Sequence, residues 1–339
     1  MASSFVGLSD VMFSSQLETL QIMSASAEVA FSLSLNGTVL LENNYVPDAS
    51  QKVTIYDLHR ILDSAIVGVC ETFTFTADTT TKTVQIIKAN VTVDIPATDF
   101  VNRFFLTTAL HERVTSPNRD EMLTLFIPTE SSDAIVATLY YYHDGAITEE
   151  SMNIVSNTIM SNVIEVNTSP RRFINETKGR LVSYIISCGT RSQTYIVERD
   201  KPDTTQIMFQ NAFGAFEFVY LSGKVETDSK FERSQVVANG VLTTTRITEE
   251  RTHAAFTGPL PRCMHPLIYD LTRTRKVGVF ANNEYRDIVI TETDVKTDNA
   301  DDTIADFCIT WRYASQFAHR IITPKTTNIF DDTFDATFN

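Results

Sequence analysis

Apolar and polar positions alternate with a period of two along most of this chain. The clearest example is 28–36, where every second residue is apolar: Val29, Phe31, Leu33 and Leu35. Asn36-Gly37 follows, and this dipeptide readily adopts the positive φ angles of a two-residue hairpin turn. The pattern therefore predicts a β-hairpin over 27–45 that turns at Asn36-Gly37 and points these four side chains inward.

The same alternation recurs in segments rich in threonine, β-branched and aromatic residues, which suit the pleated surface of a sheet. Late in the chain, Phe307, Ile309, Trp311 and Tyr313 form one apolar face. A second Asn-Gly dipeptide, Asn239-Gly240, separates two such segments and predicts another hairpin. We expect further strands at 72–76, 91–95, 121–127, 135–142, 181–187, 193–198, 216–226, 241–248, 286–292 and 307–313.

Helical periodicity is rare. The best case is Ile55–Val67, where five residues form one apolar stripe: Leu58, Ile61, Leu62, Ala65 and Ile66. The segments 99–106 and 265–272 are weaker candidates. The sequence thus predicts a mainly β protein with two or more antiparallel β-sandwich or barrel domains and one or two short helices.

A chain of 339 residues exceeds the size at which one hydrophobic core usually stops growing. Asn167-Thr168-Ser169-Pro170 and two arginines combine small polar residues, a proline and charge, which is typical of a junction. We therefore place an N-terminal β-rich domain at 1–165 and a second at 166–323. The stretch 324–339 is expected to be an acidic tail or a strand exchanged with a neighbour.

The charge balance narrows the class of partner. Lys+Arg number 28 against 42 Asp+Glu, a formal net charge of −14 that repels a phosphate backbone. The N-terminal residues do not resemble a secretory signal, and no apolar run reaches the roughly 20 residues that span a bilayer. We expect a protein made in the cytoplasm, with no specific nucleic-acid partner and no membrane insertion.

Few residues have the spacing of a metal site. Cys70, Cys188, Cys263 and Cys308 lie far apart, which favours buried free thiols over a zinc site or disulfides. The nearest Cys/His pair, Cys263 and His265, supplies too few ligands. The acidic cluster Asp294, Asp298, Asp301 and Asp302 lacks the order and glycine of an EF-hand, so an acidic loop is favoured over a calcium site. No metal or other cofactor is expected.

Signatures of catalysis are likewise missing from the sequence: it has no GxSxG, GxGxxG, P-loop or HExxH motif. Neighbouring acids occur at Glu149-Glu150, Glu249-Glu250, Asp301-Asp302 and Asp331-Asp332. Adjacent residues on a strand point to opposite faces, so these pairs do not predict the two facing carboxyls of a glycosidase. We expect no enzyme activity and name no catalytic residue.

The segment FQNAFGAFEFVYLSG, residues 209–223, is unusually aromatic. It could form an aromatic platform for a sugar or nucleobase, or the interior of a sheet. In a strand, Phe216, Phe218 and Tyr220 would share one face and Glu217, Val219 and Leu221 the other. Both faces would then be largely apolar, which favours a strand covered on both sides by its own domain or by a neighbouring subunit. The candidate core or interface residues are Phe209, Phe213, Phe216, Phe218 and Tyr220.

Three stretches resemble virion proteins of phages and prophages of gut Bacteroidales, of the tail or baseplate kind. They are AEVAFSLSLNGTVLLENNYVPD, VTIYDLHRIL and MFQNAFGAFEFVYLSGKVETDSKFERSQ, together 60 of the 339 residues. The matching positions are Asn36, Gly37, Tyr45, Pro47, Asp48, Tyr56, Asp57, Leu58, Asn211, Phe213, Gly214 and Glu217. The resemblance implies a β-rich, ring-forming, non-catalytic protein similar in role to distal-tail components, and it supplies no catalytic residues.

Two classes of function remain from the sequence. The first is a structural virion subunit of the tail or baseplate that forms a closed ring with itself and contacts other virion proteins. A capsid decoration protein is a variant of this hypothesis. The second is a β-rich module that binds a host-surface glycan or protein, and it predicts exposed aromatic residues in loops. A β-sandwich glycosidase is a more distant alternative.

Overall fold

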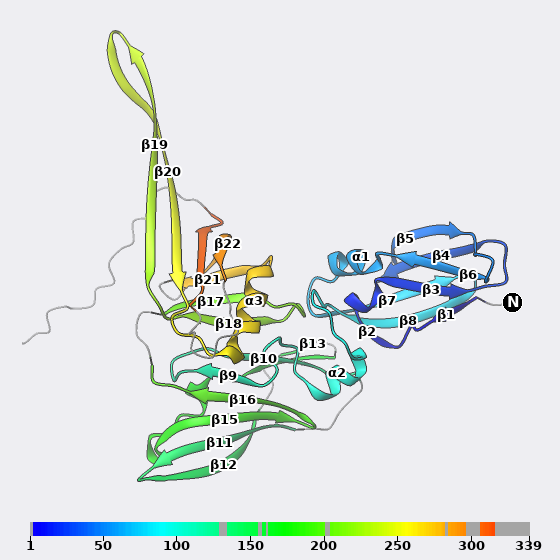
Figure 1. Cartoon of the computed structure of the whole chain (residues 1–339), viewed down its shortest axis with the longest axis horizontal. Coiled ribbons are helices and arrows are strands. Elements are labelled where there is room, and N and C mark those ends of the chain that lie inside the picture. Colours follow the sequence, from blue (N-terminus) through cyan, green and yellow to red (C-terminus); the bar gives the residue numbers. More distant parts are fainter. Residues whose placement is uncertain are drawn as a thin grey trace, which may run out of the picture.

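The computed structural model describes residues 3–128, 134–154, 158–160, 162–200, 204–281, 284–295 and 306–315, without the side chains of 158–160 and 281. These residues form three groups of sheets that follow one another along the chain (Figure 1). Each group has its own cluster of buried hydrophobic side chains. A fourth cluster contains residues from all three groups and joins them.

The first group is a sandwich of two sheets. Its three-stranded sheet has the order β1 (Ser4–Val6), β3 (Thr19–Met23), β6 (Lys52–Tyr56). Its five-stranded sheet has the order β2 (Val11–Phe13), β8 (Thr80–Ile87), β7 (Cys70–Ala77), β4 (Val29–Leu35), β5 (Thr38–Tyr45). The 3-10 helix η1 (Ser14–Leu17) and the helix α1 (Leu58–Ala65) complete this group.

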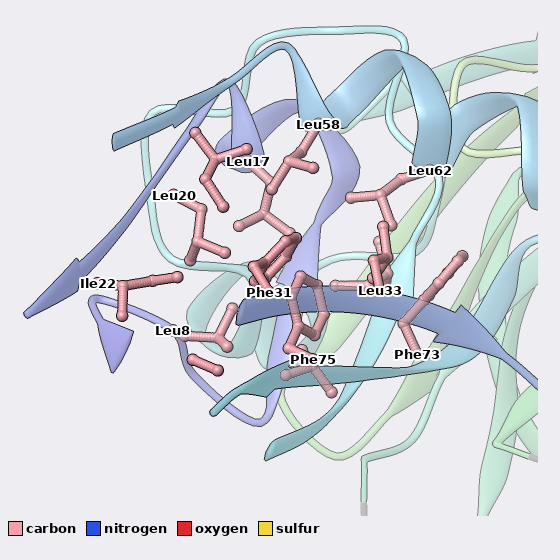
Figure 2. Close-up of a cluster of buried hydrophobic side chains, with 14 of the residues drawn as sticks. Leu8, Leu17, Leu20, Ile22, Phe31, Leu33, Leu58, Leu62, Phe73 and Phe75 are labelled. Atoms are coloured by element: carbon pink, nitrogen blue, oxygen red, sulfur yellow. The ribbon is translucent and has the colours of Figure 1, made fainter. Parts of the chain in front are cut away.

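Alternation and helical periodicity meet in the core of this sandwich, which Figure 2 shows. The apolar stripe of α1 and one face each of β3, β4 and β7 supply side chains that are at most 1% exposed: Leu20, Ile22, Phe31, Leu33, Leu58, Leu62, Phe73 and Phe75. A large apolar side chain buried in this way stabilises the fold by roughly 1.5–3 kcal/mol. The predicted helix and the strand at 72–76 are confirmed.

The predicted hairpin is also confirmed. β4 and β5 pair from Val29–Tyr45 to Leu35–Thr38, and Asn36 and Gly37 turn with φ of 50° and 79°. Val29, Phe31 and Leu33 are buried, and Leu35 is half-buried against the same core. Turn chemistry and hydrophobic alternation specified one register.

The second group also has two sheets. The larger has the order β12 (Ala146–Ile154), β11 (Ile135–His143), β15 (Arg180–Cys188), β16 (Arg191–Val197), β9 (Glu112–Thr115), and β9 runs parallel to β16. The smaller has the order β10 (Met122–Phe126), β14 (Val163–Asn167), β13 (Thr158–Met160). Helix α2 (Ala97–Arg103) precedes them, and the 3-10 helices η2 (Pro170–Arg172) and η3 (Glu176–Lys178) connect β14 to β15.

The third group is one seven-stranded sheet. Its order is β18 (Phe216–Leu221), β17 (Thr205–Gln210), β21 (Val277–Ala281), β22 (Glu284–Asp294), β23 (Cys308–Tyr313), β20 (Val241–Phe256), β19 (Val225–Ala238). The 3-10 helix η4 (Arg262–Met264) and helix α3 (His265–Arg273) follow β20, and the buried residues of α3 pack against this sheet.

The mainly β, antiparallel fold class is confirmed, and the described residues contain three short α-helices, one at each helical candidate. The boundary expected after residue 165 falls inside β14, and β9 and β11 before it pair with β16 and β15 after it. The stretch 324–339 lies outside the described residues. The division into domains stays a prediction.

Two strand predictions were wrong. The segment 91–95 is not a strand: Val91, Val93 and Ile95 pack on the joining cluster, while the carbonyl of Ile95 accepts a hydrogen bond from the Gln16 side chain instead of a neighbouring strand. The expected strand 216–226 is two strands, β18 and β19, interrupted at Gly223. There the backbone N–H of Gly223 donates to the carbonyl of Phe256 at 2.9 Å. The chain thus passes from β18 at one end of the sheet to β19 at the other.

Candidate functional site

The aromatic segment 209–223 lies where the three groups of sheets meet. Phe209 belongs to the buried cluster of the seven-stranded sheet, and Phe213 to the cluster that joins the groups. The Phe213 ring centroid is 5.6 Å from that of Phe13 and 5.4 Å from that of Phe100, so one ring comes from each group. These two phenylalanines are therefore internal packing residues and not part of an exposed platform.

A tight loop at 211–215 holds Phe213 in this position. The Asn211 side-chain oxygen accepts hydrogen bonds from the backbone of Phe213 at 2.9 Å and Ala215 at 3.0 Å, and its amide donates to the carbonyl of Leu106 at 2.8 Å. Gly214 has φ of +80°, and a Cβ placed there would overlap the carbonyl oxygen of Gly68 in the first group. This glycine permits the closest approach between the loop and the N-terminal sandwich.

The strand β18 is fully buried on one face only. Glu217, Val219 and Leu221 are buried, whereas Phe216, Phe218 and Tyr220 are half-buried. The second face has polar as well as aromatic neighbours: Lys276 lies 5.0 Å over the Phe216 ring, and the Tyr220 hydroxyl donates to the Asp120 carbonyl at 3.0 Å. The described residues therefore do not bury both faces of β18, and cover by a neighbouring subunit stays a prediction.

The buried face of β18 carries a charge that alternation did not predict to lie inside. The Glu217 Oε1 accepts a hydrogen bond from Arg113 Nη2 at 2.5 Å, and Arg113 Nη1 is 3.6 Å from Glu121 Oε2. All three side chains are buried. Arg113 lies on β9, Glu121 just before β10 and Glu217 on β18, so this buried charge cluster joins the second and third groups of sheets.

Burial sets the protonation of this cluster. Burial raises the pKa of Glu121 to about 7, and the nearby Arg113 guanidinium offsets part of that rise. For Arg113, burial opposes the positive charge, but the Glu217 carboxylate and other nearby groups outweigh it and leave the pKa above its ordinary value. One arginine faces two carboxyl groups, so the folded state favours a proton on Glu121.

Glu121→Gln should flatten the dependence of stability on pH. The pKa of Glu121 is raised from an ordinary 4.5 to about 7, so its contribution is present at low pH and lost as pH rises through about 7. The wild-type free energy of unfolding should fall between pH 5 and pH 8 by roughly 1–3 kcal/mol from this group, and Gln, which stays neutral, should remove that part. Urea unfolding at both pH values measures it. Equal slopes in the two proteins would contradict the prediction.

The other chemistry-bearing residues noted in the sequence are dispersed. Within the described ranges, no group of three or more His, Cys, Asp or Glu side chains could hold a metal ion. The four cysteines form no disulfide with one another; Cys188 is buried and the others are half-buried. Glu150 pairs with Lys178 and Glu250 with Arg312. Of the acidic cluster, Asp298, Asp301 and Asp302 lie outside the described residues. A groove of about 500 Å³ beside β22 has Arg275 and Glu292 as its charged lining residues.

The most exposed feature of the molecule is the hairpin of β19 and β20, here called the arm. It projects from the seven-stranded sheet away from the rest of the molecule (Figure 1). The two strands pair from Val225–Ala255 to Ala238–Val241 and turn at Asn239-Gly240, which confirms the second predicted hairpin. At the root, His253–Phe256 of β20 also pair with β23, and among the described residues the remainder of the arm pairs only with itself.

The arm divides into a polar stem and an apolar tip. Along the stem, charged residues occupy one face of β19 at Glu226, Asp228, Lys230 and Glu232. The arm tip is apolar on both faces and consists of Val236, Val237, Ala238, Val241 and Leu242. Its four larger side chains are 48–64% exposed. The sequence signal for a projecting strand is that Phe231 is the only apolar residue over 226–235, so that neither face has an apolar stripe to bury.

None of the described helices has the length and apolar character needed to cross a membrane. No protein-family model matches the sequence, and no curated protein matches it either.

Three solved structures are similar to parts of this chain. A chain of the virion of a native gene transfer agent particle matches over 33% of this chain and 92% of its own, with 10% identity and a TM-score of 0.23. A chain from a structure on host cell surface retention of a 1.5-MDa bacterial ice-binding adhesin matches over 73% and 88%, with 8% identity and a TM-score of 0.17. The native alpha-2-macroglobulin of E. coli matches over 85% and 21%, with 9% identity and a TM-score of 0.16. The chain is thus only weakly similar to a virion component and to an adhesin, and TM-scores this low establish neither its fold nor its function.

Proposed function

We propose that this protein is a non-catalytic structural subunit of a bacteriophage virion, a tail or baseplate component that assembles into a ring with copies of itself. The observation that carries the assembly role is the arm, a long exposed hairpin with an apolar tip. The virion setting follows from the resemblance of 27–48, 53–62 and 208–235 to phage tail and baseplate proteins, the last of which extends into β19. The subunit would be made in the host cytoplasm and reside in the virion.

The arm should bind a partner because an isolated two-stranded hairpin is only marginally stable in water. β19 has 14 residues, so the arm extends about 45 Å at roughly 3.3 Å per residue. Most of that length has no third strand and no core among the described residues. Its tip also exposes clustered aliphatic side chains, which mark interaction sites. Burial on a partner would contribute roughly 1.5–3 kcal/mol for each large aliphatic side chain that becomes fully covered.

The charge of the arm favours a protein partner that is acidic. Between residues 233 and 247 the charged side chains are Arg233 and Arg246, a charge of +2 in a chain of net −14. A second copy of this chain, or another acidic virion protein, would attract this half of the arm. The same acidic balance would keep the ring from adhering to DNA that passes through it.

Shortening the arm should abolish assembly without unfolding the body. In the test variant, Asn-Gly replaces residues 233–247, so that the turn joins Glu232 to Thr248, which are partners in the native hairpin. We expect the wild type to form oligomers and the shortened variant to stay monomeric at the same concentration. Sedimentation equilibrium measures the mass, and circular dichroism checks that the sheets remain.

A matched control separates the arm tip from general effects on the arm. Lys230→Ala changes an exposed side chain of the stem and should leave the oligomer mass unchanged. If the shortened variant assembles as the wild type does, the arm is not the assembly element. If it assembles normally but loses adhesion to host cells, the alternative of a host-surface binding module replaces the proposal.

A further inference from the structure

One sheet face of the body has the surface chemistry of a docking site. The outer face of the sheet β12-β11-β15-β16-β9 carries Tyr142 and Ile147 as a direct cross-strand pair, at 46% and 65% exposure. The next row holds Glu149, Tyr140, Ser183 and Ile196, and Ile196 is 39% exposed. Aromatic and aliphatic side chains thus lie open on this face between one carboxylate, Glu149, and one guanidinium, Arg180, which lies opposite Tyr142 on β15, and the described residues do not cover them.

The five-stranded sheet of the N-terminal sandwich shows what a solvated face in this protein contains. Its outer rows are mostly hydroxyl side chains, with Ser32 opposite Thr76 and Ser34 opposite Thr74. The edge strand β5 adds Glu42 beside Ser32 and the exposed Val39 beside Ser34. Thr74 and Thr76 in turn face Thr83 and Thr81. The two sheets have the same number of strands, but the outer face of the second exposes more large apolar side chains: Tyr142, Ile147 and Ile196, against Val39 in the first. The apolar face of the second sheet therefore needs a partner in a way that the first does not.

The arm tip is complementary to this face in two respects. It is apolar on both faces, so it can bury Tyr142 and Ile147 whichever face it presents. Arg233 and Arg246 flank it and carry the charge opposite to that of Glu149, which is exposed. The tip has no Trp or Tyr, the aromatic residues that are enriched at membrane interfaces, so a protein face suits it better than a membrane.

The two surfaces cannot meet within one molecule. Figure 1 shows the arm leaving the seven-stranded sheet at one end and the sheet that contains β12 at the opposite end. We propose that the arm tip of one copy docks on the outer face of this sheet, around Tyr142 and Ile147, in the next copy. The contact is heterologous, one surface meeting a different surface, and such contacts generate rings when the rotation closes. This inference rests on the proposed function and specifies its interface.

The first test places a charge on the docking face. Ile147→Lys puts an unpaired cation among apolar groups of the proposed contact and should raise the dissociation constant of self-association by roughly tenfold or more. Thr83→Lys adds the same charge to the solvated outer face of the N-terminal sheet and should leave association unchanged. Sedimentation velocity of both variants and the wild type, with circular dichroism to verify folding, gives the comparison.

The second test uses the two-surface geometry. The shortened-arm variant retains the docking face, and Ile147→Lys retains the arm, so neither should assemble alone at a concentration close to the wild-type dissociation constant. Mixed in equal amounts, they should form a one-to-one complex that does not grow further, because only one productive contact exists in that pair. Glu149→Arg should weaken association, and combining it with Arg233→Glu and Arg246→Glu should restore part of it.

The outcomes distinguish a wrong docking face from a wrong assembly role for the arm. If the shortened variant is monomeric but Ile147→Lys and Glu149→Arg assemble as the wild type does, the docking face is wrong and the assembly role of the arm stands. If the shortened variant also assembles normally, both fail. A wild-type chain that stays monomeric at every concentration overturns docking between copies. Should Ile147→Lys misfold, the charge reversals at Glu149, Arg233 and Arg246 decide.

Discussion

Arg113→Met should lower the free energy of unfolding by about 3–5 kcal/mol, the typical cost of removing one partner from a buried ion pair. The substitution leaves Glu217 and Glu121 buried without their cation, while methionine retains most of the volume. Because the cluster joins β9 to β18, the loss should be cooperative across the second and third groups of sheets. Urea unfolding followed by circular dichroism measures it.

Two further variants separate charge from packing. Arg60→Met removes an exposed arginine that pairs with Asp57 on the surface, and it should change stability by less than about 1 kcal/mol. Adding Glu217→Gln to Arg113→Met should cost much less than the sum of the two single changes, since the second charge no longer needs a partner. An Arg113→Met protein as stable as Arg60→Met would show that the buried cluster contributes nothing net.

Gly214→Ala should destabilise the protein by about 2–5 kcal/mol, from a left-handed backbone that alanine disfavours and from overlap with a neighbour that cannot move freely. The φ of Gly214 is +80°, and its added methyl group would meet the backbone of Gly68 in the N-terminal sandwich. We expect the sandwich to loosen from the remaining sheets. Limited proteolysis should then cut between them faster than in the wild type, and thermal unfolding should begin earlier.

Gly240→Ala is the matched control, because it isolates the backbone effect. Gly240 has a similar φ of +76° at the arm turn, but nothing lies within 4 Å of an added Cβ. Its cost should be limited to about 1–2 kcal/mol of local strain, confined to the arm and invisible in the unfolding of the core. Equal effects of the two substitutions on the core would mean that the Gly68 contact does not constrain Gly214.

Local signals in the sequence were enough for much of the fold. Two Asn-Gly turns located both hairpins, because the positive φ angles that they require are a property of those residues alone. The apolar stripe that includes Leu58 and Leu62 located α1, since a helix of 3.6 residues per turn must bury such a stripe. Phe209 and Phe213 were expected to be core or interface residues, and the structure buries both.

Contacts between residues far apart in the sequence decided the features that local signals did not predict. Glu217 shares its strand face with Val219 and Leu221, and only Arg113, 104 residues earlier in the chain, explains how a carboxylate lies in that interior. The alternation at 91–95 indicated a strand, but the segment covers an apolar surface and pairs with no strand among the described residues. A period of two reports which side chains face inward and not whether a backbone partner exists.

The arm shows most clearly which features the sequence determines and which the tertiary structure determines. The sequence by itself predicted a tight turn at Asn239-Gly240 and a strand over 241–248 after it, because turn geometry and strand propensity are local. Only the tertiary structure decided that β20 meets β23 at its root and that the remaining length leaves the sheet, because that depends on where β23 ends. The exposure of the tip, and with it the candidate interface, follows from this long-range pairing and not from any property of the segment alone.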